Sequence, residues 1–131
     1  MNQSVTTPEW FESEAAKLEE RLDLHDEQGH HKIHNWQDAQ ESFVKLTAAL
    51  PGAAAAHDSF QAQRRACSAL QENFQKDPSE LNRTALEQAT NECKAAQTTW
   101  YNKEEQVNNY LKSTSASLDE LPDLPSSDNE W

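Results

Sequence analysis

The chain has 131 residues, of which 23 are acidic and 11 are basic, so its formal net charge is −12. Two glycines and a mean hydropathy of −0.99 leave no material for a glycine-rich phosphate loop or for an apolar stretch of about 18 residues that crosses a membrane. Too few Lys and Arg side chains are present to replace the counterions of nucleic acids or anionic lipids. We therefore expect one domain, no direct nucleic-acid or membrane binding, and a neutral or basic partner.

The first seven residues carry no positive charge and no apolar run, so they lack the features of a secretory signal. We expect a flexible N-terminus over residues 1–7 and a cytoplasmic protein. An export route that needs no signal peptide stays open as an alternative.

A first helix is predicted over residues 8–27. Thr7 suits the capping position, Pro8 suits the first helical position, and acidic residues in the first turn suit the positive end of the helix dipole. Apolar residues spaced by four, three and four positions form one face: Phe11, Ala15, Leu18 and Leu22. Gly29 is expected to end this element.

Two further helices are predicted over residues 31–50 and 53–76. Each carries a stripe of mainly apolar residues at spacings of three or four, which is typical of a helix with one buried face. The pair Pro51-Gly52 separates them, because proline in a helix interior removes a hydrogen bond and clashes with the preceding turn. We therefore expect a helix break at Pro51.

The last predicted helix, over residues 78–113, is the longest. Asp77 is placed to cap it, and Pro78 is placed at its first position. At roughly 35 residues and ~50 Å it outruns neighbours of about 20 residues and ~30 Å. Its distal apolar stripe of Trp100, Val107 and Tyr110 then lacks cover within the chain. This indicates one alternative function, a self-associating coiled-coil subunit that forms a homodimer through this helix.

No segment alternates apolar and polar residues as a strand does, and the four predicted helices are joined by short breaks. Short connections favour antiparallel neighbours. The sequence thus predicts an all-α protein, an antiparallel up-down bundle of four helices over residues 8–113.

Residues 114–131 contain two prolines and five acidic residues and are expected to form a disordered acidic tail. Residues 1–28 hold eight acidic and two basic residues, whereas residues 29–113 hold ten and nine. The negative charge is therefore concentrated on the first helix and the tail. Such a distribution indicates two docking elements rather than a charge spread for solubility.

The two cysteines have a geometric interpretation. If the last two helices form a hairpin about residues 77 and 78, Cys67 lies opposite residue 88, and Cys93 lies five residues further along. That offset is ~7 Å along the helix axis, which is too far for a disulfide. We expect two free thiols that pack as small apolar side chains.

Histidines cluster between residues 25 and 34, interleaved with acidic residues: His25, His30, His31 and His34. If the second helix begins early enough, His30 and His34 share a face and are candidate metal ligands. A metal-responsive or pH-responsive protein is therefore a second alternative function. The simpler interpretation is a solvated connection in which histidine caps a helix end.

Nothing in the chain predicts catalysis. The tripeptide His57-Asp58-Ser59 has the residue types of a catalytic triad, but sequence neighbours point around a helix rather than toward one another. We expect no enzyme activity, no catalytic residue and no cofactor.

The leading hypothesis is a non-enzymatic protein-protein interaction module that inhibits, escorts or protects a partner with a basic surface. In the tail, leucines alternate with acids, and Trp131 is placed as an aromatic anchor for a partner pocket. The alternatives for the tail are an inert flexible end and a tail that folds back on its own helices. The predicted partner-binding residues are Glu9, Glu12, Glu19, Asp23, Leu118, Asp119, Glu120, Leu121, Asp123, Leu124 and Trp131.

Overall fold

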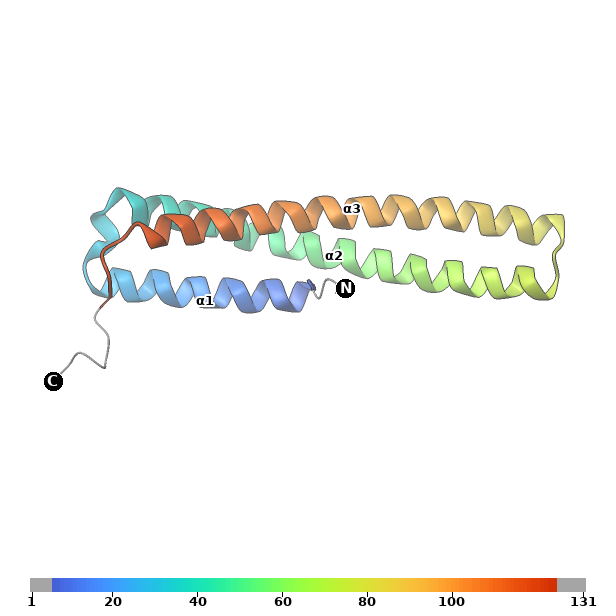
Figure 1. Cartoon of the computed structure of the whole chain (residues 1–131), viewed down its shortest axis with the longest axis horizontal. Helices are drawn as coiled ribbons and strands as arrows, with labels where there is room; N and C mark the ends of the chain where they lie inside the picture. Colours follow the sequence, from blue (N-terminus) through green and yellow to red (C-terminus); the bar gives the residue numbers. More distant parts are fainter. Residues whose placement is uncertain (1–5, 125–131) are drawn as a thin grey trace. The chain divides into compact units, whose positions relative to one another are not determined.

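The computed structural model describes residues 6–124 and contains three α-helices and one short 3-10 helix (Figure 1). In chain order these are α1 (Pro8–Glu27), η1 (His30–Lys32), α2 (His34–Lys76) and α3 (Glu80–Asp119). No strand occurs in residues 6–124. The all-α prediction is confirmed, but the prediction of four helices is wrong, because three long helices are present.

Helix α1 begins and ends where the sequence predicts. The Thr7 side chain accepts a hydrogen bond of 3.1 Å from the backbone N–H of Trp10, and Pro8 occupies the first turn. At the other end Gly29 has a φ of +81°, a left-handed conformation that glycine adopts without strain. Its N–H donates to the carbonyl of Asp26 at 2.9 Å, which closes the helix terminus.

Helix α2 passes through Pro51 and Gly52 without ending, so the predicted break at this pair is wrong. Proline costs the helix one hydrogen bond, but the residues on both sides stabilise the helical conformation. Four alanines, the best helix formers, follow directly at residues 53–56. Leu46 before the proline and Ala53 after it are both fully buried. Packing on both sides therefore overrides the local preference of Pro51.

Helix α3 differs from the prediction at both ends. Ser79 replaces Asp77 as the cap, since its hydroxyl oxygen accepts from the N–H of Asn82 at 3.1 Å. The helix then runs to Asp119, six residues beyond the predicted end at residue 113. Thr114 and Leu118 are buried along this extension, so the prediction of a disordered tail is wrong for residues 114–119. Burial of these side chains stabilises a helical segment that its serine-rich composition alone does not favour. Residues 1–5 and 125–131 lie outside the described part of the chain.

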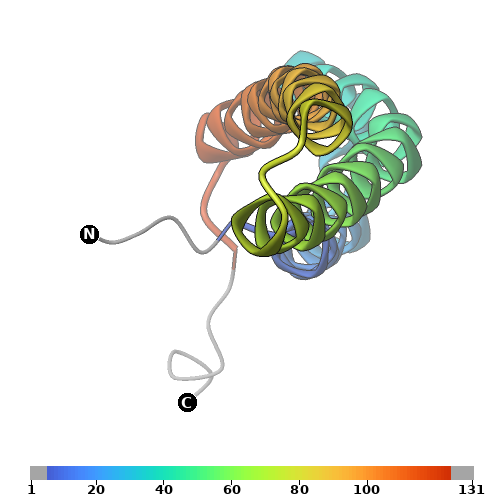
Figure 2. The same ribbon diagram turned by 90° about the vertical axis from the view of Figure 1, so that its right-hand side faces the viewer.

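The described chain divides into two compact units. Unit 1 comprises residues 6–50 and 106–124, and unit 2 comprises residues 51–105. Unit 1 therefore holds α1, the first part of α2 and the last part of α3 (Figure 1). Unit 2 holds the remainder of α2 and α3 with the turn that joins them, which faces the viewer in Figure 2.

Unit 1 is held together by side chains from all three of its helices. Large apolar side chains that are at most 2% exposed come from each of these helices: Phe11, Leu22, Leu46, Val107 and Leu118. The indole N–H of Trp36 on α2 donates to the carbonyl of Leu22 on α1 at 3.0 Å, which joins those two helices. The hydroxyls of Ser42 and Ser113 lie 3.0 Å apart and join α2 to α3.

Unit 2 is a pair of helices with a narrow apolar seam. Trp100 is 4% exposed, and its ring meets that of His57 edge-on, with ring centroids 4.7 Å apart. Cys67 and Cys93 are free thiols, as predicted, but they are half-buried and not enclosed in the core as expected. The sulfur of Cys67 lies 3.5 Å from the hydroxyl oxygen of Thr90, two positions from the residue that the hairpin register predicts.

The premise for a homodimer through the last helix is wrong. Helix α2 has 43 residues and α3 has 40, so neither outruns the other as the four-helix prediction required. Trp100 and Val107, which were expected to lack cover, are 4% and 0% exposed. Tyr110 is half-buried. The distal stripe of α3 is therefore covered within the chain.

Candidate functional site

Four of the predicted partner-binding carboxylates lie on one exposed face of α1. Glu9, Glu12, Glu19 and Asp23 are separated by three, seven and four residues, which places them along a single stripe of the helix. All four are exposed. None of them forms an ion pair within residues 6–124. We call this stripe the α1 acidic face.

The core side of α1 holds the acidic face in position. Phe11, Ala15, Leu18 and Leu22 are at most 7% exposed. These residues fix the rotation of α1 about its axis, because turning the helix would bring them into water. The carboxylates of the α1 acidic face therefore project from a packed helix.

The charge of the molecule is unevenly divided between the two units. The described part of unit 1 contains 13 acidic and five basic residues, whereas unit 2 contains eight and six. Within unit 2, Arg83 of α3 contacts both Glu80 and Glu87. The negative field therefore comes mainly from unit 1, where the α1 acidic face lies.

The predicted recognition segment of the tail is partly buried. Leu118 is 1% exposed and Leu121 is 6% exposed, so both side chains belong to the core of unit 1 and do not face a partner. The alternative that the tail folds back on its own helices is the correct one for these residues. Asp119, Glu120 and Asp123 are exposed, and Leu124 is half-buried. Trp131 lies outside the described residues.

Asp119 is the one tail carboxylate with an ion-pair partner in residues 6–124. Its oxygen lies 2.8 Å from a guanidinium nitrogen of Arg21 on α1. A small cavity of about 200 Å³ lies beside this pair, lined by His25 of α1 and by Leu118, Asp119 and residues 121–124. The predicted docking elements on α1 and on the tail are thus in contact with each other.

The histidines of the cluster do not converge on one point. Nδ1 of His30 lies 2.8 Å from Nδ1 of His25, whereas His34 on α2 contacts Asp38 at 3.2 Å. His31 contacts Asp26 at 3.0 Å. Among residues 6–124, no group of three or more His, Cys, Asp or Glu side chains is placed to hold a metal ion. The predicted ligands His30 and His34 therefore have different partners, and no third ligand joins them there.

His25 is buried in unit 1, although the sequence pattern indicated a solvated histidine cluster. It is 4% exposed, and burial, followed by the nearby His30 and Arg21, lowers the pKa of its imidazole below the ordinary value of 6.5. Its position three residues after Leu22 continues the spacing of the apolar face of α1. That spacing is the signal that could have placed His25 in the core.

Comparison with protein-family models, with curated protein sequences and with solved structures finds no match to this chain. None of the helices in residues 6–124 is both long enough and apolar enough to cross a membrane.

Proposed function

We propose that the protein is a non-enzymatic interaction module that binds a protein partner with a basic surface through the α1 acidic face. The observation that carries this proposal is the stripe formed by Glu9, Glu12, Glu19 and Asp23, whose carboxylates are exposed and make no ion pair in residues 6–124. The stripe extends over ~21 Å of helix, a length that fits a basic helix or strand of a partner.

Two physical features support this surface over other acidic residues of the chain. A packed helix presents the carboxylates, so binding orders little additional structure and costs less conformational entropy than ordering a free segment. The excess of 13 acidic over five basic residues in unit 1 also attracts a basic partner at a distance and raises its association rate. Glu120 and Asp123, which are also exposed, add to the negative potential of unit 1.

The binding is expected to depend strongly on salt, because exposed charges are screened over about 8 to 10 Å at physiological ionic strength. The test is affinity capture from the native host with the full chain as bait, followed by mass spectrometry and by titration of the purified partner. We expect a basic protein that is retained at about 50 mM salt and released at about 500 mM salt. Equal retention at both concentrations contradicts the proposal.

A charge-matched pair of variants locates the surface. The first carries Glu9→Gln, Glu12→Gln, Glu19→Gln and Asp23→Asn. The control removes the same number of charges from exposed positions of unit 2, with Asp58→Asn, Glu72→Gln, Glu92→Gln and Glu105→Gln. We expect the first variant to lose at least tenfold in affinity and the control to lose less than threefold. The reason is that a surface charge affects binding most when it lies close to the docked partner. Equal losses in both variants contradict the assignment to α1.

A further inference from the structure

A groove on unit 1 has the features of a small-molecule site and lies apart from the α1 acidic face. It runs between α1 and the last part of α3 and encloses about 390 Å³, within the range of about 300 to 1,000 Å³ of ligand pockets. Leu18 and Leu111 form its floor and are 7% and 8% exposed. Trp10 stands at its edge with 39% of its surface exposed.

The lining of this groove is positively charged, whereas unit 1 as a whole is negatively charged. Of the five basic residues in the described part of unit 1, three line the groove: Lys17, Arg21 and Lys112. One carboxylate, Glu14, lies among them. The groove therefore has a local excess of positive charge within a unit that is otherwise strongly acidic.

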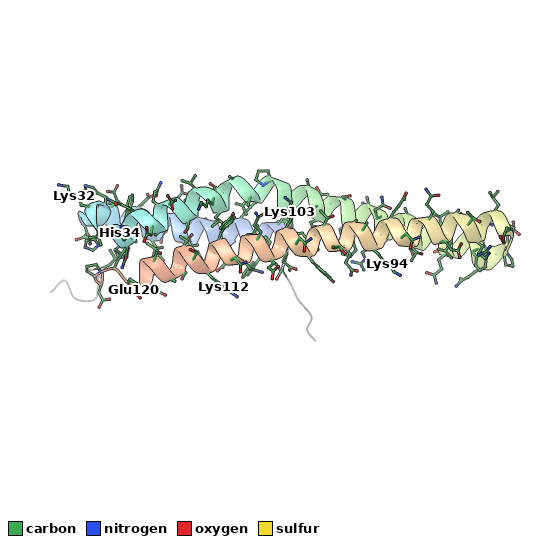
Figure 3. All side chains as sticks on the ribbon, turned by 90° about the horizontal axis from the view of Figure 1, so that it is seen from above. Lys32, His34, Lys94, Lys103, Lys112 and Glu120 are labelled. Atoms are coloured by element: carbon green, nitrogen blue, oxygen red, sulfur yellow. The ribbon has the colours of Figure 1, made fainter. Side chains whose placement is uncertain are left out.

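The three cations are not equally available to a ligand. Lys17 contacts Glu14 at 2.9 Å, and Arg21 contacts Asp119 at 2.8 Å. Lys112, which Figure 3 labels on α3, forms no ion pair within residues 6–124. A bound anion would thus meet an uncompensated ammonium at Lys112, with two further cations close by.

The surrounding charge also limits how negative the ligand can be. With 13 acidic residues against five basic ones in unit 1, a polyanion such as a polyphosphate or a nucleic acid is repelled. The single negative charge of one carboxylate is balanced by the ammonium of Lys112 in the groove. On α1 the apolar lining residues Trp10 and Leu18 are eight positions apart, or ~12 Å along the helix axis, which suits a short alkyl chain lying parallel to the helix.

We propose that this groove binds a medium-chain alkyl carboxylate, with its chain on Leu18 and Leu111 against Trp10 and its carboxylate at Lys112. The positive groove lining and the apolar floor complement the two ends of such a molecule. This site is independent of the α1 acidic face and of the proposed protein partner.

The test is calorimetric titration of the full chain with octanoate, decanoate and decanol below their aggregation concentrations. We expect decanoate to bind about tenfold more tightly than octanoate, because two more methylenes are transferred from water. Decanol has the same apolar chain but no charge, and we expect at least fivefold weaker binding. Equal affinities for decanoate and decanol overturn the proposal.

Variants locate the site on the protein. Lys112→Gln is expected to weaken decanoate binding at least fivefold, and Trp10→Ala is expected to weaken it several-fold. Lys45→Gln is the control, since Lys45 is an exposed lysine of the same unit that does not line the groove. Thermal unfolding confirms that each variant is folded. A loss in the Lys45 variant equal to that in the Lys112 variant overturns the proposal.

A chain that ends at Leu124 provides the last arm of the experiment. All residues of the groove are retained in it, so decanoate is expected to bind at least as tightly as to the full chain. Loss of binding on removal of residues 125–131 overturns the proposal.

Discussion

Nδ1 of His25 lies 2.8 Å from Nδ1 of His30, and the centroids of the two rings are 5.1 Å apart. A hydrogen bond needs one donor and one acceptor, so only one of these two nitrogens carries a hydrogen while the contact exists. The contact joins the last turn of α1 to η1.

Acidification is expected to destabilise unit 1 through His25. The folded protein holds the pKa of His25 below 6.5, so the unfolded chain takes up this proton first as the pH falls. The stabilising contribution is complete above about pH 6.5 and is lost as the pH falls toward the folded pKa. The slope for one proton does not exceed about 1.4 kcal/mol per pH unit. Urea unfolding between about pH 7.5 and 5.5 measures it.

Two substitutions separate the causes of this pH dependence. His25→Gln removes the titrating group and is expected to flatten the dependence. His30→Gln leaves His25 buried, and burial is the largest cause of the lowered pKa, so part of the dependence should remain. Arg21, Asp119 and Asp123 face the same cavity and are unchanged in both variants. A His25→Gln protein with the slope of the parent chain would falsify this account.

Replacing Pro51 is expected to stabilise the protein. Pro51 lies inside α2, where it supplies no N–H to the helix, and it is exposed. Pro51→Ala restores that hydrogen bond and should raise the free energy of unfolding by about 1 to 3 kcal/mol. Pro78→Ala is the control, because Pro78 lies in the turn between α2 and α3. There the loss of proline should lower stability by about 0.4 to 1 kcal/mol. A loss of stability on Pro51→Ala contradicts the prediction.

Gly52 offers an independent test of the same helix segment. A Cβ atom at this position would lie 3.8 Å from Nζ of Lys103, which is an ordinary contact distance. Gly52→Ala is therefore expected to raise stability by about 0.5 to 1 kcal/mol, since alanine loses less backbone entropy in a helix. Gly29→Ala is the contrasting change, because Gly29 has a φ of +81° and alanine is strained there. Thermal unfolding of both variants should give shifts of opposite sign.

Local signals in the sequence predicted some parts of the fold and failed at others for a physical reason. Thr7 and Gly29 act within one helical turn, so their effects on α1 are readable from neighbouring residues. The hairpin register was also predictable to within two positions, because Cys67 faces Thr90 where residue 88 was expected. The continuity of α2 through Pro51 was not predictable from local signals. The cost of proline in the helix is offset by side chains such as Leu46 and Ala53, which pack in different units.

The candidate site was predictable in its charges but not in its burial. Spacing alone placed Glu9, Glu12, Glu19 and Asp23 on one face of α1. The leucines of the tail have the same local pattern whether they bind a partner or their own helices. Only the packing of Leu118 against the rest of unit 1 distinguishes these alternatives.

Leu118 anchors the last part of α3, and its truncation is expected to be costly. The side chain is 1% exposed, so Leu118→Ala leaves a cavity in unit 1 and should lower the free energy of unfolding by about 2 to 5 kcal/mol. Leu81→Ala is the matched control, because Leu81 is 79% exposed and the same change there should cost less than about 0.5 kcal/mol. Chemical denaturation followed by circular dichroism measures both values.

Two truncations extend this test to the whole segment. A chain that ends at Ser113 lacks Thr114, Leu118 and Leu121, all of them buried, and unit 1 should lose its cooperative unfolding transition. A chain that ends at Leu124 keeps these residues and should unfold as the full chain does. If the chain that ends at Ser113 unfolds with the midpoint of the full protein, residues 114–121 do not belong to the core. The binding experiments with shortened chains therefore need the boundary at Leu124, because a cut at Ser113 removes core side chains of unit 1 together with the exposed acids of the tail.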